Sequence, residues 1–184
     1  MALAAHTATV TVDPTLVKGG SSETYSFSVA NDSGSANFIQ YIKMTAPIGF
    51  SITGSVSCPV GWGPVTTGMP SYIECLGSAD PSDNKKIDPG ATGTVSFTAT
   101  APSADSTNPW VVLTKDNAFD QQTSNPVTTV DATVPTVTSI TTKDTDANGR
   151  VDTATILFSE AVDDSTFAPN DFSIGGSEIG RAHV

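Results

Sequence analysis

One segment of the sequence carries the side-chain pattern of a calcium-binding loop. Oxygen-bearing side chains occupy the first, third, fifth and ninth positions of this segment, at Asp144, Asp146, Asn148 and Asp152. Gly149 occupies the sixth position, where the chain has to curl. Calcium takes about six to eight oxygen ligands, and alternate residues converge on one point around such a turn. The pattern therefore predicts a Ca²⁺ site with these four residues as ligands.

The same segment has a second interpretation that needs no metal. The dipeptide Asn148-Gly149 is typical of a two-residue type I′ turn in a β-hairpin. The twelfth position, where an EF-hand has a glutamate, is Thr155, and strands rather than helices are expected on either side. The fold would have to bring back Glu160 or Asp163 to supply that ligand. A calcium site and a plain hairpin turn both remain open.

Cys58 and Cys75 are the two cysteines of the chain, and they flank a segment rich in Gly and Pro at residues 60–70. Their place on neighbouring expected strands favours a disulfide over two buried thiols. In the chain-entropy model the bond would close a loop of about 17 residues and stabilise the fold by roughly 3 kcal/mol. Such a bond requires an oxidising compartment. Two cysteines without a nearby histidine are too few for a structural zinc site.

Trp62 is the candidate for contact with a ligand or partner. It lies between Gly61 and Gly63 in the segment at residues 60–70, which is expected to be a loop. An exposed indole at that position would stack on a sugar ring or on a protein partner. In the alternative, Trp62 folds back over the hairpin of Cys58 and is buried.

The sequence shows no pattern typical of an enzyme. His6 is the one histidine outside the C-terminal hexapeptide, and its place near a frayed N-terminus argues against a Ser-His-Asp triad. A nucleophile elbow, a phosphate-binding loop and a zinc-protease motif are all absent. Adjacent carboxylates such as Asp163-Asp164 would point to opposite faces of a strand, which makes them poor acid–base partners. The chain is therefore not expected to be an enzyme.

The charge balance excludes two classes of partner. The 184-residue chain carries 19 acidic against 8 basic residues, which gives a formal net charge of −11. Nucleic acids and anionic membrane surfaces both require clustered cations, so neither is an expected partner. The sequence also has no run of about 18 apolar residues, so no segment is expected to insert into a membrane.

Short stretches of alternating polar and apolar residues dominate the first 130 residues, separated by turn signals at about the spacing of a β-sandwich. The fold class predicted is all-β, with an Ig-like antiparallel β-sandwich at residues 6–130. The aromatic residues expected to face its core are Tyr25, Phe27, Phe38, Phe50, Phe97 and Trp110.

A linker is predicted at residues 131–136, where Pro135 holds the residue before it in an extended conformation. Strand patterns restart at residue 137, with strands expected at 136–142, 153–158 and from 172. An Ig-type sandwich needs about 100 residues, so residues 137–178 are expected to be the N-terminal part of a second, truncated Ig-like sandwich.

Both ends of the chain are expected to be cuts. The alanines of residues 1–5 have the pattern that a signal peptidase recognises, with an ordinary Ala-rich N-terminus as the alternative. Residues 179–184 match the translation of one frame of a common sequencing adapter, which predicts a non-native tail. A natural tail is the alternative.

Two groups of residues carry a resemblance to known domains. In the second unit these are Ser159-Glu160-Ala161-Val162 after an apolar strand, the Asp144–Gly149 segment before it and Asp171-Phe172-Ser173-Ile174-Gly175 after it. Over Val134–Gly176 the chain resembles the bacterial Ig-like domains of S-layer proteins, adhesins and secreted hydrolases. The first unit is similar to Ig-like repeat domains of large surface proteins, through Tyr25-x-Phe27-x-Val29 and Ala46-Pro47-x-Gly49-Phe50.

The resemblance implies tandem modules on an exported protein and no catalytic residues. The function expected is that of a non-catalytic structural or adhesive module of a larger secreted or cell-surface protein. The alternative is an accessory spacer or a carbohydrate-binding module of a secreted hydrolase. The expected partners are neighbouring modules of the same chain, with a cell-surface glycan or protein as a further candidate.

Overall fold

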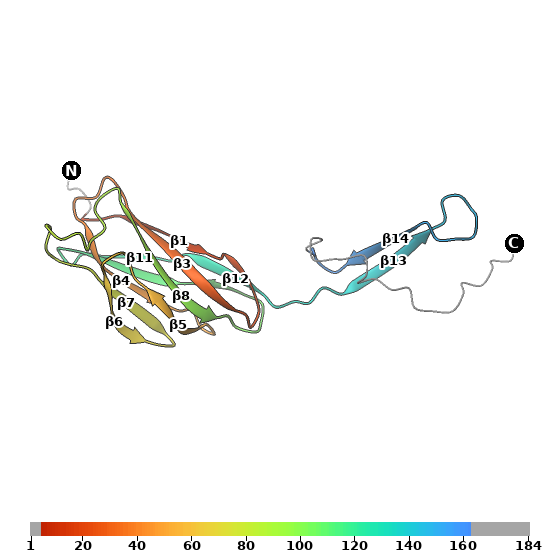
Figure 1. Ribbon diagram of the computed structural model, residues 1–184, viewed down its shortest axis with the longest axis horizontal. Coiled ribbons are helices and arrows are strands. Elements are labelled where there is room, and N and C mark those ends of the chain that lie inside the picture. The colour runs from red at the N-terminus through yellow and green to blue at the C-terminus, as the bar shows by residue number, and fades with distance from the viewer. Residues whose placement is uncertain (1–4, 163–184) are drawn as a thin grey trace. The chain divides into compact units, whose positions relative to one another are not determined.

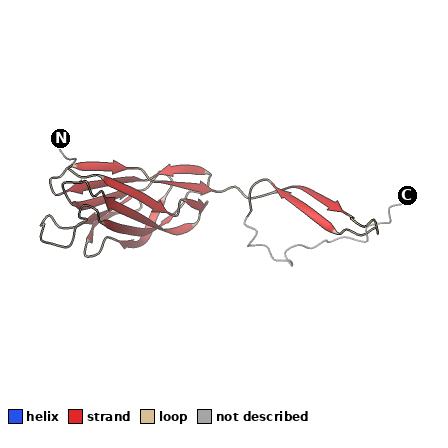
Figure 2. Cartoon of the chain, turned by 90° about the horizontal axis from the view of Figure 1, so that it is seen from above, coloured by secondary structure: helices blue, strands red, loops and turns tan. Residues whose placement is uncertain are grey.

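The computed structural model of the protein describes residues 5–162, with the backbone alone at residues 65–68. Within this part of the chain every regular element is a strand and none is a helix, as Figure 2 shows. This confirms the all-β fold class, and no described helix is long and apolar enough to cross a membrane. The expectations for residues 1–4, the strand from residue 172, Asp163 and the tail at 179–184 lie outside the described residues.

The chain divides between Thr133 and Val134 into two units, and the first is a sandwich of two antiparallel sheets (Figure 1). One sheet has the order β1-β3-β8-β5, formed by Ala8–Asp13, Ser22–Asn31, Thr92–Thr100 and Ser51–Ser57. The other has the order β11-β10-β4-β7-β6, formed by Gln121–Ser124, Val111–Asp116, Ile39–Thr45, Tyr72–Leu76 and Gly63–Gly68. A smaller sheet has the order β2-β12-β9, formed by Leu16–Lys18, Val127–Asp131 and Ser106–Pro109.

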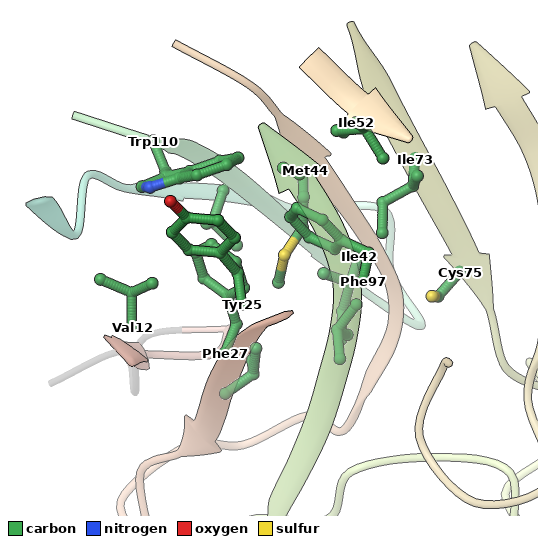
Figure 3. Close-up of a cluster of buried hydrophobic side chains, with 14 of the residues drawn as sticks. Val12, Tyr25, Phe27, Ile42, Met44, Ile52, Ile73, Cys75, Phe97 and Trp110 are labelled. Carbon is green, nitrogen blue, oxygen red and sulfur yellow. The ribbon is translucent and has the colours of Figure 1, made fainter. Parts of the chain in front are cut away.

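Side chains at every second strand position fill the space between the two large sheets (Figure 3). Trp110, just before β10, lies among the aromatic rings, with its ring centroid 5.1 Å from that of Tyr25 and 5.5 Å from that of Phe97. Its indole N–H donates to Thr128 Oγ1 at 3.0 Å, so the polar atom of this buried ring is paired. All six aromatic residues expected in the core are buried, as predicted.

The segment at residues 60–70 is not the irregular loop expected from its Gly and Pro content. Residues 63–68 form β6, which pairs with β7 from Gly63↔Leu76 to Gly68↔Tyr72, with one bulge after Pro64. The edge of β7 offers main-chain partners to any extended segment that reaches it, and this pairing overrides the local preference for a loop. Sequence alone therefore missed this edge strand.

In the second unit the described residues form one antiparallel hairpin of β13 (Val137–Lys143) and β14 (Thr153–Phe158). Most of its side chains are exposed, because the described residues of this unit provide no second layer to cover the hairpin. The hairpin holds the loop at residues 144–152 between two paired strand ends. The acidic residues of the sequence motif lie in this loop.

Candidate functional site

The loop between β13 and β14 brings three carboxylates together. Asp144, Asp146 and Asp152 are all exposed, and one oxygen atom of each lies within 4.8 Å of the others. Calcium holds its oxygen ligands at about 2.3–2.6 Å, so two ligands of one ion lie up to about 5 Å apart. The spacing and the hard oxygen chemistry of these three side chains therefore fit one Ca²⁺ ion.

Main-chain N–H groups of the loop orient the first of these carboxylates. Gly149 N donates to Asp144 Oδ2 at 2.7 Å, and Asn148 N donates to Asp144 Oδ1 at 3.2 Å. The hydrogen bond from Gly149 is the largest cause that holds the pKa of Asp144 below its ordinary value. Gly149 has a φ of +80°, in the left-handed region that glycine adopts without strain, so this donor depends on the residue type.

Asn148, the fourth predicted ligand, takes a different part in the loop. Its Nδ2 donates to Asp146 Oδ2 at 2.7 Å, and its Oδ1 accepts from Arg150 N at 2.8 Å. In this geometry the amide nitrogen of Asn148 positions the Asp146 carboxylate, and the role of Asn148 as a calcium ligand stays a prediction. Glu160, considered as a distant ligand, is not in that group, and Asp163 lies outside the described residues.

The structure contains a disulfide between Cys58 and Cys75, whose Cα atoms are 5.7 Å apart. Cys58 directly follows β5 of one sheet, and Cys75 lies in β7 of the other. The pairing of β5 with β8 shifts register at Gly54 and again before Ser57, so the end of β5 departs from regular pairing. The bond therefore ties the two sheets of the sandwich to each other.

Trp62 is buried in the core, with 8 % of its surface exposed. Its ring packs on Gly77, where an added Cβ would lie 2.7 Å from Trp62 Cε2. This arrangement corresponds to the alternative in which Trp62 covers the hairpin, and it leaves little indole surface for a sugar. A cleft of about 370 Å³ lies beside it, lined by Ser57, Thr92, Thr94 and Lys86 among others.

The structure reveals a buried polar network that the sequence analysis missed. His6 is buried, not frayed, and its Nε2 lies 2.9 Å from Thr114 Oγ1. On the other side of the ring, His6 Nδ1 lies 3.5 Å from Asp116 Oδ2. The expectation that His6 lies in a frayed N-terminus is therefore wrong, because its ring is buried between a threonine hydroxyl and a carboxylate. A signal existed in β10, where Thr114 and Asp116 occupy inward positions that normally carry apolar side chains.

Asp116 is held rigidly in this network. Its Oδ2 accepts from Asn37 Nδ2, and its Oδ1 accepts from the main-chain N–H groups of Ala118 and Asp120, each at 2.9 Å. The side chain of Gln40 donates to the main-chain oxygen of Asp116 at 3.0 Å. These bonds satisfy a carboxylate that has no exposure to water, and they fix its orientation toward His6.

Comparison with known proteins gives a fold and no family. No family model and no curated protein matches the chain. An uncharacterized protein from Nocardia farcinica, described as having an immunoglobulin-like fold, matches with a TM-score of 0.50 and 17 % identity, over 66 % of this chain and 96 % of its own. The first unit shares that immunoglobulin-like fold.

Two further solved structures match less closely. A putative membrane anchored protein from Corynebacterium diphtheriae has a TM-score of 0.45 and 14 % identity, over 68 % of this chain and 34 % of its own. A cohesin from scaffoldin B of Acetivibrio cellulolyticus, solved in complex with a dockerin, has a TM-score of 0.45 and 12 % identity, over 67 % of this chain and 99 % of its own.

Proposed function

We propose that this chain is a non-catalytic structural module of a larger secreted or cell-surface protein, in which an Ig-like sandwich precedes a second unit that binds calcium. The disulfide between Cys58 and Cys75 is the observation that carries the proposal. Disulfides persist in oxidising compartments and are rare in the cytosol. A covalent tie between the two sheets also suits a module that has to stay folded outside the cell.

The interior of the sandwich supports a structural role. The large rings of Tyr25, Phe27 and Phe97 pack around Trp110 with centroid distances of 5.1 to 5.5 Å from it. Buried hydrophobic side chains fill the space between these strands, and Figure 3 draws part of this cluster. Such packing suits a spacer, whose purpose is to keep its shape.

The end of the first unit is also held firmly, as a spacer requires. Asp105 Oδ1 accepts from Ala132 N and, at 3.1 Å, from Thr133 N, while Oδ2 accepts from the Thr133 hydroxyl. The hydroxyl of Thr133 is the largest cause that lowers the pKa of Asp105, followed by the N–H of Ala132. The chain is thus fixed up to the last residue of the first unit, within the segment predicted to be a linker.

In this proposal Asp144, Asp146 and Asp152 hold one Ca²⁺ ion, and Asn148 positions Asp146. The ion would remove the mutual repulsion of the three carboxylates and fix the loop of the second unit. Extracellular calcium sites are often weak, with Kd on the order of 10⁻⁴ to 10⁻³ M, which matches a loop that supplies few protein ligands. Calcium would thereby stiffen the start of the second unit in an extended surface protein.

Calcium titration of the full chain, followed by NMR, tests the proposal. The amide of Gly149 is the reporter, because it donates to Asp144 in the loop. We expect saturable shifts at Gly149 with Kd on the order of 10⁻⁴ to 10⁻³ M. Asp146→Asn should abolish them, while Asp83→Asn in an exposed loop of the first unit should not. Identical spectra with Ca²⁺ and with EDTA would show that Asn148-Gly149 is only a turn.

Two other functions, carbohydrate binding and a spacer role beside a hydrolase domain, can be distinguished from this proposal. A carbohydrate-binding function would need an exposed platform, and the burial of Trp62 does not favour it. A glycan array would test that function directly. The full-length reading frame would distinguish an S-layer or adhesive array from a spacer beside a hydrolase domain.

A further inference from the structure

The buried network around His6 has the connectivity of a catalytic triad. Thr114 Oγ1 lies 2.9 Å from His6 Nε2, and Asp116 Oδ2 lies 3.5 Å from Nδ1. Nδ1 makes no hydrogen bond within the described residues, and the Asp116 carboxylate is the charged group beside it. In the tautomer with its proton on Nδ1, Nε2 is free to accept the proton of the Thr114 hydroxyl. Because all three side chains are buried, an electrophile for this hydroxyl has to belong to the chain itself.

The carboxamide of Gln122 is placed to be that electrophile. Gln122 lies directly opposite Thr114 in the β10–β11 ladder, and its side chain is half-buried. Directly opposed Cβ atoms in an antiparallel pair are about 4.5–5.5 Å apart, which brings the hydroxyl and the carboxamide carbon within reach of each other.

The carbonyl oxygen of Gln122 also has a donor of the kind that stabilises an oxyanion. Ala8 N donates to Gln122 Oε1 at 2.9 Å, and this donor is two residues from His6. A main-chain N–H at this position polarises the carbonyl group and would stabilise the negative charge that develops on attack. One short segment thus supplies both the base and the oxyanion donor, although it is more than 100 residues from Thr114 in sequence.

We propose that Thr114 and Gln122 become joined by an intramolecular ester bond, with His6 as the catalytic base and Asp116 as a positioning residue. Thr114 Oγ attacks Gln122 Cδ while its proton passes to His6 Nε2. The tetrahedral intermediate then collapses, the Cδ–Nε2 bond of Gln122 breaks, and His6 returns the proton to the leaving nitrogen. The products are a Thr–Gln ester and one molecule of ammonia, so the reaction needs no oxidant or co-reactant.

Three features of the surroundings favour the ester between Thr114 and Gln122. Well-oriented intramolecular groups react with effective molarities of about 10⁵–10⁸ M, and the ammonia is lost to dilute solvent. Burial of His6, Thr114 and Asp116 limits the access of water to the ester from the core, while its Gln122 side is half-buried. The ladder of β10 with β11 contains four residue pairs and lies at the edge of its sheet, so a covalent tie would secure a short edge strand.

Intact mass spectrometry of the purified full chain is the primary test. We expect a mass about 17 Da below the value calculated for the disulfide-bonded sequence, because ammonia is lost. Trypsin cuts after Lys115, between the two residues. After reduction the peptides of residues 87–115 and 116–143 should therefore stay linked, and hydroxylamine should separate them. A succinimide at Asn148-Gly149 has the same mass loss, but it lies in the separate peptide of residues 144–150.

Matched variants assign the roles. Thr114→Val and Gln122→Glu should each have the calculated mass and yield two separate peptides, while Gln121→Glu, on the exposed side of β11, should keep the link. His6→Gln should abolish the link, and Asp116→Asn should slow its appearance in a time course of freshly purified protein. Circular dichroism identifies any variant that fails to fold. A wild-type chain that keeps the full mass and gives two separate peptides after prolonged incubation would overturn the proposal.

Discussion

Loss of the Cys58–Cys75 disulfide is expected to destabilise the first unit by about 3 kcal/mol. The two residues are 17 apart in sequence, and closing a loop of that length removes roughly 10 cal/mol/K of entropy from the unfolded chain, which gives this free energy at 25 °C. Unfolding entropy is about 2.1 cal/mol/K per residue, so a unit of roughly 130 residues should lose roughly 10 °C in Tm.

The assay is thermal unfolding followed by circular dichroism, with the full chain compared before and after reduction. A Cys58→Ala/Cys75→Ala variant is the control, and reductant should leave its Tm unchanged. Cys75 is buried, so its replacement by alanine also removes packing. The difference in Tm between this variant and the reduced wild type measures the packing lost with the sulfur atoms. An unchanged wild-type Tm, with two free thiols verified by mass, would refute the loop-entropy reasoning.

Three further outcomes follow from the structure. Trp110→Ala should cost about 3–5 kcal/mol in chemical unfolding, because the indole is fully buried among aromatic rings. Gly77→Ala should cost about 1–3 kcal/mol, since its Cβ would lie 2.2 Å from Lys85 O, whereas Gly34→Ala meets nothing within 4 Å and should be neutral. In an NMR pH titration Asp105 should show a pKa below the ordinary value of an aspartate side chain. Its lowered pKa means that its contribution to stability is present above the unfolded-state pKa and lost as the pH falls through the folded-state pKa. Thr133→Val removes the hydroxyl that donates to Asp105, so it should bring the midpoint of the Asp105 titration back toward the ordinary aspartate value.

The sequence by itself determined six aromatic positions of the core of the first unit. Alternation of apolar and polar residues is a local property, because successive side chains of a strand point to opposite faces. It therefore placed Tyr25, Phe27 and Phe97 inside without knowledge of the strand order. The acidic loop was visible for the same reason, since the spacing of Asp144, Asp146 and Asp152 around Gly149 is local to nine residues.

Contacts between distant segments were decided by the tertiary structure alone. His6 meets Thr114 across 108 positions of sequence, and Ala8 meets Gln122 across 114. Inward polar residues in β10 signalled that a buried partner exists, but their pattern carries no information on which segment supplies it. That choice depends on how the sheets close on each other, which places the start of β1 beside the edge strand β11 and buries a histidine near the N-terminus.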